Sequence, residues 1–174
     1  FYIWEGGMSF HGALLGILFG ILVISIKDKI NFFKLSDFIV VFIPLGLLLG
    51  RVGNFINSEL YGMPTNSNWG VIFTKIDSIP RHPSMLYESL LEGLILFIIL
   101  KTIYNKKPMT GKLSAFFLIY YAFFRFIVEF VRVPDIQIGY LYGDWLTMGM
   151  LLSIPMFLVG LIIYYLSIQG KIEK

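Results

Sequence analysis

Five long apolar stretches constrain the fold of this 174-residue chain more than any other feature. Each is close to the ~20 residues that an α-helix needs to cross the hydrocarbon layer of a bilayer. Charged residues make up only 14% of the sequence, against about 25% in an ordinary soluble domain. We therefore predict an all-α, polytopic membrane protein with at least five transmembrane helices, at residues 8–26, 36–55, 84–104, 113–131 and 144–166.

We expect one transmembrane domain over residues 1–174. The only long connection covers residues 57–83, where turn-forming residues such as Gly62 and Pro64 gather, and we expect it to be an extracytoplasmic loop segment. Because the sequence begins at Phe1 and not at a methionine, we also expect that an upstream part is missing, so that this domain is N-terminally incomplete and the number of helices is a minimum.

The lysines predict the orientation, because short loops rich in Lys and Arg stay on the cytoplasmic side. If the five stretches alternate in direction, nine of the ten lysines fall on one side and only Lys75 falls on the other. The visible N-terminus is then extracytoplasmic and the C-terminus cytoplasmic. The arginines follow another pattern: Arg51, Arg81 and Arg132 lie near the outer ends of spans, and Arg125 lies inside the fourth span.

Ionisable residues inside the spans gather in their outer halves. At the centre of a span such a residue costs about 2.5–3.5 kcal/mol on insertion scales, so each one needs a partner or a function. Four different spans contribute to this convergence, through His11, Arg51 and Asn54, Glu88 and Glu92, and Arg125 and Glu129. We interpret the convergence as a functional site.

The fourth span carries a polar stripe. Tyr121, Arg125 and Glu129 recur every four residues and Arg132 follows three later, so all four are predicted to share one helical face. An ion pair between Arg125 and Glu129 that only locks the helices together is an alternative reading of this stripe.

The third span carries two carboxylates four residues apart, Glu88 and Glu92, which would repel each other if both were charged. Either one is protonated or each has its own cation, and Arg51 and Arg125 are candidate partners. Glu92 is equally well explained as a neutral buried carboxyl group that bonds a neighbouring helix.

The densest group of polar and glycine residues runs from Gly50 to Gly62. Glycines allow close backbone approach, an arginine offers a planar fork of donors, and amide side chains both donate and accept. These groups suit the binding of a phosphate and of hydroxyls. The segment has no G-K-[ST] ending and no preceding strand, so it is neither a P-loop nor a dinucleotide fingerprint.

Metal and nucleic-acid sites are not predicted. His11 and His82 are the only histidines, neither has a second ligand at metal spacing, and the chain has no cysteine. A histidine in the position of His11 is as often structural as chemical, and we read His82 as mainly architectural. The net charge of +3 is too small to indicate a nucleic-acid partner.

The segment from Gly50 to Gly62 resembles the signature of the bacterial prolipoprotein diacylglyceryl transferase family. Its sequence is Gly-Arg-Val-Gly-Asn-Phe-Ile-Asn-Ser-Glu-Leu-Tyr-Gly. Three further segments match the family in the same order: residues 6–12 (Gly-Gly-Met-Ser-Phe-His-Gly), 81–88, which begins Arg-His-Pro-Ser and ends Tyr-Glu, and 125–130 (Arg-Phe-Ile-Val-Glu-Phe).

This resemblance implies transfer of a diacylglyceryl group from phosphatidylglycerol to the thiol of a lipobox cysteine in a prolipoprotein signal peptide. The transfer forms a thioether and releases glycerol phosphate, with no cofactor, at the bacterial inner membrane. His11 is suited to activate the thiol, and Arg51 and Arg125 to bind the phosphate. We assign catalysis to His11, Arg51 and Arg125, and substrate binding to Arg51, Asn54, Glu59, Gly62, Glu88, Tyr121, Arg125 and Glu129.

More specific roles can be assigned within this set. Asn54 and Glu59 suit glycerol hydroxyls, Glu129 is placed to orient Arg125, and Glu88 is placed to pair with Arg51. Two alternatives come from other classes: a fragment of a transporter or channel with a polar helix stripe, and a non-catalytic lipid-binding membrane protein. The nearly uncharged inner halves of the spans argue against a permeation path.

Overall fold

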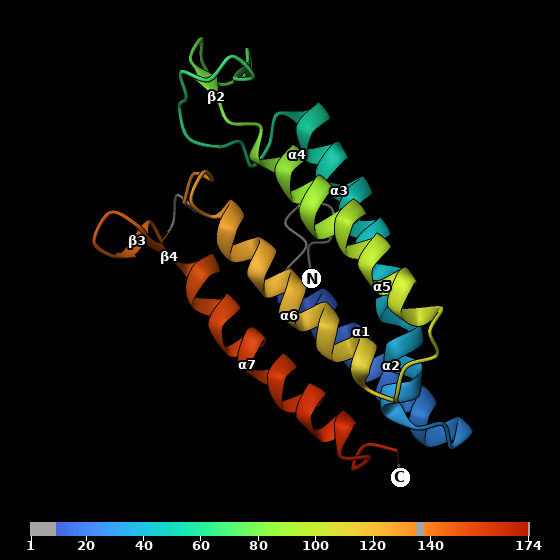
Figure 1. Cartoon of the computed structure of the whole chain (residues 1–174). Coiled ribbons are helices and arrows are strands. Elements are labelled where there is room, and N and C mark those ends of the chain that lie inside the picture. Colours follow the sequence, from blue (N-terminus) through green and yellow to red (C-terminus); the bar gives the residue numbers. More distant parts are fainter. Residues whose placement is uncertain (1–9, 135–137, 174) are drawn as a thin grey trace.

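The computed structural model describes residues 10–134 and 138–173, without the side chains of residues 10–14. Figure 1 shows long helices that lie side by side along one main direction, joined by connections at the two ends of the bundle. The helices of the described residues are α1 (Phe10–Asp28), α2 (Phe32–Val40), α3 (Ile43–Asn57), α4 (Ser84–Glu88), the π-helix η2 (Ser89–Ile95), α5 (Leu96–Tyr104), α6 (Lys112–Val128) and α7 (Met148–Ile168).

The predicted second span is two helices in the structure. Helix α2 ends at Val40 and α3 begins at Ile43, with Pro44 in its first turn. Proline suits that position, because it has no N–H group to place in the helical hydrogen-bond pattern. The side chain of Asn31 caps α2 by accepting hydrogen bonds from two backbone N–H groups, so the helical segment begins four residues before the predicted residue 36.

The predicted third span has its predicted ends, Ser84 and Tyr104, but it is not a uniform α-helix. Helices α4 and α5 are joined without a break by η2, which contains Glu92 and Gly93. A π segment has an i→i+5 hydrogen-bond pattern, is rare, and is frequently found at functional sites. Ser89, the first residue of η2, donates a side-chain hydrogen bond of 3.2 Å to the carbonyl of Leu48 on α3.

Glycines set the closest helix contacts. A β-carbon placed on Gly93 would lie 2.6 Å from Cβ of Leu48, so η2 and α3 pack at backbone distance. Gly160 plays the same part between α7 and α6, where a β-carbon would lie 3.1 Å from the carbonyl oxygen of Ala115. In Figure 1, α6 and α7 run side by side along their length.

A buried carboxylate joins α2 to the start of α6. Asp37 accepts hydrogen bonds from the backbone N–H groups of Gly111 (2.6 Å) and Ser114 (2.8 Å), and from the Ser114 hydroxyl (2.7 Å). Its carboxylate therefore acts as an N-cap for a helix that is distant in sequence.

The prediction of an all-α chain missed two short hairpins. Strand β1 (Val71–Ile72) pairs antiparallel with β2 (Pro80–Arg81), and β3 (Tyr140–Tyr142) pairs with β4 (Leu146–Thr147). The second hairpin occupies the start of the predicted fifth span, so α7 begins at Met148, after residue 144. Strands this short give only a weak sequence signal, and the chain is mostly helical.

Two of the described helical segments are long and apolar enough to cross a membrane by length and composition, Phe32–Asn57 and Met148–Ile168. The other three predicted spans remain predictions. Large apolar side chains on α7 point away from the bundle, and Leu158, Ile162 and Tyr165 are more than half exposed. A surface of this kind is unfavourable in water and suits contact with lipid.

The two ends of the bundle differ in charge. Figure 1 shows the α1–α2 connection, the α5–α6 connection and the end of the chain at one end of the bundle. We call this the lysine end, because eight lysines of the described residues lie in or next to these segments: Lys27, Lys29, Lys34, Lys101, Lys106, Lys107, Lys112 and Lys171. The segment of residues 57–83 and the β3–β4 hairpin lie at the opposite end.

Candidate active site

Three arginines surround the carboxylate of Glu88, which is fully buried near the end of α4. Nε of Arg51 lies 2.7 Å from Oε2 of Glu88, and Nη1 of Arg125 lies 3.0 Å from the same oxygen. The other oxygen, Oε1, lies 3.8 Å from Nε of Arg132. The predicted pairing of Glu88 with Arg51 is confirmed, and Glu88 contacts Arg125 as well.

A second buried carboxylate completes this cluster. Glu129, the residue that follows α6, places Oε2 3.1 Å from Nη2 of Arg125 and Oε1 3.6 Å from Nη1 of Arg132. The predicted contact between Glu129 and Arg125 is therefore confirmed. Gly149 of α7 packs against the Glu129 carboxylate, so a fourth helical segment also borders the cluster.

Glu92 lies in η2 and is also fully buried. Neither of its carboxylate oxygens has a hydrogen-bond partner among the described residues, and Nη1 of Arg125 lies 3.9 Å from its Oε1. Arg125 is thus shared by three carboxylates while Glu92 holds the weakest of the three contacts. Among the described residues Glu92 makes no hydrogen bond to a neighbouring helix, and Glu88 and Glu92 share Arg125, so they do not each have a cation of their own.

A polar chain leads from this cluster towards the end of α3. Nη1 of Arg51 donates a hydrogen bond of 3.4 Å to Oδ1 of Asn54, and Nδ2 of Asn54 donates one of 3.1 Å to Oε2 of Glu59. Ser58 ends α3 in the left-handed conformation (φ 61°) and turns the chain so that Glu59 folds back towards Asn54. Three residues of the family-like segment therefore form one connected network.

Gly62 lies where two backbone segments meet. Its N–H donates to the carbonyl of His82 at 2.9 Å, and a β-carbon on it would lie 2.5 Å from that oxygen and 2.6 Å from the carbonyl oxygen of Val131. No side chain fits there, which explains the glycine. Its predicted role in substrate binding remains a prediction.

Arg132 is not on the helical stripe that the sequence predicts. Helix α6 ends at Val128, and Arg132 forms an isolated antiparallel bridge with Gly62. The backbone contact with the 57–83 segment holds the chain after α6 in an extended form, and Pro134 also disfavours a longer helix. Even so, the side chain of Arg132 returns to Glu88 and Glu129.

Two predicted site residues remain, Tyr121 and His11. Tyr121 lies one turn before Arg125 on α6 and is 8% exposed in the apolar core, where its ring stacks on Phe117 with 5.7 Å between centroids. His11 belongs to the first turn of α1, and its side chain lies outside the described part of the chain.

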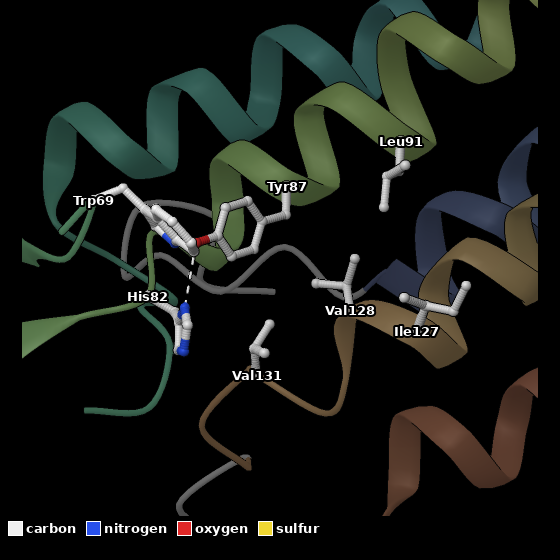
Figure 2. Close-up of a pocket in the computed structure, with 7 residues that line it drawn as sticks. All are labelled: Trp69, His82, Tyr87, Leu91, Ile127, Val128 and Val131. Carbon is white, nitrogen blue, oxygen red and sulfur yellow. Dashed lines mark hydrogen bonds between the residues drawn. The ribbon is translucent and has the colours of Figure 1, made fainter. Parts of the chain in front are cut away.

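An apolar cavity of about 390 Å³ is lined in part by residues that neighbour the charged cluster in sequence. Figure 2 shows Tyr87 and Leu91 on one wall and Ile127 and Val128 of α6 on the other, with Trp69 and His82 near one end. Nδ1 of His82 lies 3.2 Å from the hydroxyl of Tyr87. Tyr87 precedes Glu88 and Val128 precedes Glu129, so the same helix segments carry the cavity lining and the carboxylates.

The charges of the cluster balance when every group is ionised. Arg51, Arg125 and Arg132 supply three positive charges, and Glu88, Glu92 and Glu129 supply three negative ones. Buried charges persist only when they are paired, so removal of one partner leaves another uncompensated. Arg51 is the most accessible guanidinium of the three, at 19% side-chain exposure against 13% for Arg125 and 8% for Arg132. An anionic group from outside would meet Arg51 first.

The family model described as prolipoprotein diacylglyceryl transferase matches residues 1–166, nearly the whole chain. The chain belongs to the prolipoprotein diacylglyceryl transferase family. The 50–62 segment and the arginine–glutamate pattern at the end of α6 both lie inside the matched range. This assignment and the apolar helices together make the chain part of a membrane protein.

Curated relatives with the name phosphatidylglycerol–prolipoprotein diacylglyceryl transferase are similar over most of this chain. The protein from Methylococcus capsulatus is 50% identical over 163 residues, which cover 94% of this chain and 62% of the relative. Those from Mannheimia succiniciproducens and Pasteurella multocida are 47% and 45% identical and cover 98% and 100% of this chain, and 64% of each relative. The chain thus spans a little under two thirds of the length of these relatives.

Sequence reasoning missed two residues of this site. Arg132 was placed on the helical stripe and was not assigned to the site, although an arginine at the outer end of a span was a usable signal. Gly149 gave no signal, because its contact with Glu129 depends on how α7 packs against the end of α6.

Proposed function

We propose that this family member transfers the diacylglyceryl group of phosphatidylglycerol to the thiol of a lipobox cysteine in a prolipoprotein. The observation that carries the proposal is the convergence of Arg51 and Arg125, from two different helices, on one oxygen of Glu88. Two guanidinium groups held side by side suit a lipid phosphate, which each can bind through two N–H groups. The names of the relatives support the same reaction.

In this reaction the sulfur of the substrate cysteine attacks the glyceryl carbon that carries the phosphate. The carbon–oxygen bond breaks, a thioether forms, and glycerol phosphate leaves with the bonding electron pair. The thiol proton passes to a base, for which we propose His11, since an imidazole titrates near neutral pH. Arg51 and Arg125 stabilise the charge that develops on the leaving phosphate.

The carboxylates keep the arginines in position while no lipid is bound. Glu88 and Glu129 hold Arg125 through two different nitrogens, at 3.0 and 3.1 Å, so the guanidinium plane is fixed before substrate arrives. Fixed donors need little reorganisation in the transition state. Asn54 and Glu59, joined to Arg51 through hydrogen bonds, are suited to the glycerol hydroxyls. The apolar cavity lined by Tyr87 and Val128, the residues before Glu88 and Glu129, offers room for an apolar part of a substrate.

We also propose a topology of five transmembrane helices in the bacterial inner membrane, with the lysine end in the cytoplasm. The gathering of lysines at one end of the bundle supports this orientation. The charged cluster then lies towards the extracytoplasmic leaflet, where the cysteine that follows the apolar core of a signal peptide emerges. The lipobox peptide and the lipid would thus meet at the same depth.

The test uses the full-length protein in lipid nanodiscs with labelled phosphatidylglycerol and a lipobox peptide. We expect a labelled thioether product with the parent protein, and at least a 100-fold slower reaction for Arg51→Gln and for Arg125→Gln. Lys75→Gln is the matched control, because Lys75 is exposed in the loop segment and the substitution removes the same charge. A near-normal rate in either arginine variant contradicts the phosphate role.

The same assay separates the alternative classes. A channel or transporter fragment, or a lipid-binding protein without activity, makes no thioether at any peptide concentration. For His11, we expect His11→Gln to slow transfer and to remove the dependence of the rate on pH near neutrality. An active variant with an unshifted pH profile excludes His11 as the base.

A further inference from the structure

A second cavity, of about 550 Å³, lies at the lysine end of the bundle, away from Glu88. It is formed where α2 meets the end of α5 and the connection to α6, segments that Figure 1 shows close together. We call it the lysine-end pocket; its lining includes Lys34, Phe38, Tyr104, Asn105, Lys107 and Leu113. The proposed transfer reaction makes no use of it.

The lining of this pocket is positively charged. Lys34 and Lys107 of the lining are both exposed. Nζ of Lys101, which is outside the lining, lies 5.2 Å from the centre of the Tyr104 ring, which does line the pocket. The lining contains one carboxylate, Asp37, and both of its oxygens accept hydrogen bonds from backbone N–H groups at the start of α6. An anion in the pocket therefore meets lysines and no free carboxylate among the described residues.

An apolar ridge leaves the pocket along α2. Phe38 lines the pocket, and Phe42 follows one helical turn later, with 5.5 Å between the two ring centroids. Both rings are about half exposed, at 53% and 49%. The ridge starts at the lysines and runs along the Phe32–Asn57 segment, which is long and apolar enough to span a membrane. A soluble anion would contact only the lysines, whereas a lipid would use both features.

We propose that the lysine-end pocket binds the phosphate-bearing headgroup of an anionic membrane lipid, whose acyl chain lies along Phe38 and Phe42. This site is separate from the Glu88 cluster. On α6, Lys112 near the pocket and Arg125 in the cluster are thirteen residues apart, or about 20 Å at the helical rise. The bound lipid joins α2 to the α5–α6 connection and is not the donor of the transfer reaction.

The test counts bound lipid by native mass spectrometry of the full-length protein with Arg125→Gln as background. Phosphatidic acid is the probe, because it carries the phosphate but lacks the second glycerol of the proposed donor. We expect one phosphatidic acid to bind, and Lys34→Gln/Lys107→Gln to weaken it on the order of tenfold. Unchanged binding in this double variant overturns the proposal.

Two controls keep the result specific. Lys112→Gln removes a charge at the same end, but its Nζ lies over the rings of Phe116 and Tyr164, so we expect unchanged binding. Lys34→Arg/Lys107→Arg changes the same two side chains but keeps both charges, so we expect the lipid to remain bound. This control distinguishes a loss of charge from a loss of folding. An equal weakening in Lys112→Gln would reveal a diffuse charge effect and overturn the pocket.

A last comparison distinguishes a lipid from a free anion. Phe38→Ala should weaken phosphatidic acid binding several-fold, because part of the apolar contact is lost. Inorganic phosphate should not displace the lipid at similar concentration. Displacement by inorganic phosphate, together with normal binding by Phe38→Ala, would show a soluble-anion site and overturn the lipid assignment. When Arg125 is kept, the variant Lys34→Gln/Lys107→Gln should transfer diacylglyceryl groups at the normal rate. A negative result for lipid binding at the pocket therefore does not bear on the transfer reaction, and the reverse also holds.

Discussion

Gly149 packs directly against the carboxylate of Glu129. A β-carbon placed on Gly149 would lie 2.6 Å from Oε1 and 2.9 Å from Oε2, closer than real contacts allow. The same carboxylate holds Arg125 at 3.1 Å and Arg132 at 3.6 Å. The start of α7 therefore fixes one wall of the charged cluster, although α7 contributes no charged side chain to it.

Gly149→Ala should disturb the cluster by pushing Glu129 away from Arg125. We expect a loss of about 1–3 kcal/mol in the free energy of unfolding, as for other overpacked sites, and slower transfer in the full-length protein. Thermal unfolding in detergent measures the first effect and the thioether assay the second. Gly20→Ala is the control, because a β-carbon there meets nothing within 4 Å. Equal melting temperatures for the two variants would contradict the contact.

Glu88→Gln should be strongly destabilising, because Arg51 and Arg125 lose the negative charge that they share. Breaking a buried ion pair from one side costs about 3–5 kcal/mol. Arg125→Gln should lower the free energy of unfolding for the same reason, because it leaves the buried carboxylates of Glu88 and Glu129 with fewer positive partners.

The two changes should not add. In the double variant Glu88→Gln/Arg125→Gln we expect a coupling energy of about 0.5–3 kcal/mol. Once Glu88 is neutral, Arg125→Gln no longer leaves the Glu88 charge without this cation, so the second change costs less than it does alone. Chemical unfolding of the four proteins of this cycle measures the coupling. Purely additive losses would mean that Glu88 and Arg125 do not interact in the folded protein.

Gly93→Ala should separate η2 from α3. The new β-carbon would meet both Cα and Cβ of Leu48, at 2.9 and 2.6 Å, and the Leu48 backbone cannot yield without moving α3. Since Arg51 lies one turn further along α3, its contact with Glu88 should lengthen. We expect a loss of about 1–3 kcal/mol in unfolding free energy. Gly46→Ala on α3, where the added β-carbon meets nothing within 4 Å, should have little effect or stabilise the helix.

The loop segment should loosen in acid. Hydrogen bonds from Arg81 hold the pKa of the Asp77 carboxyl below its ordinary value of 3.8. Because the folded pKa is lowered, the stabilisation is present above the unfolded pKa and is lost as the pH falls through the folded one. The carbon-13 chemical shift of the Asp77 carboxyl should therefore titrate below pH 3.8 in the parent protein.

Arg81→Gln is the matching variant for this titration. It keeps the length of the side chain nearly unchanged and removes the charge, so the Asp77 pKa should return towards its ordinary value. An unchanged titration in Arg81→Gln would show that another group lowers the pKa.

Much of the architecture could be predicted because it depends on short stretches of sequence. Long apolar runs predict helices, and the observed helix Ser84–Tyr104 has the predicted ends even though η2 lies inside it. The break between α2 and α3 and the two hairpins were missed. Pro44 suits the interior of an apolar run as well as the first turn of a helix, so the sequence pattern does not distinguish one helix from two.

Most residues of the site could be predicted from the sequence, but the contacts between them could not. A four-residue spacing puts Glu88 and Glu92 on neighbouring turns, but it does not say which one faces an arginine. In the structure Glu88 contacts three arginines, while Glu92 has a single cation at 3.9 Å among the described residues. The height and rotation of neighbouring helices decide this, and the contacts of Gly93 set them for α3.

The sequence by itself determined the membrane character, the unequal distribution of lysines and the family, because hydropathy, charge and a local motif are properties of consecutive residues. The tertiary structure alone decided that Arg51 and Arg125 share one carboxylate oxygen, that Arg132 reaches them from beyond the end of α6, and that Gly149 supports Glu129. Each of these relationships joins residues that are distant in the chain, and close packing of helices at glycines brings them within a few ångströms.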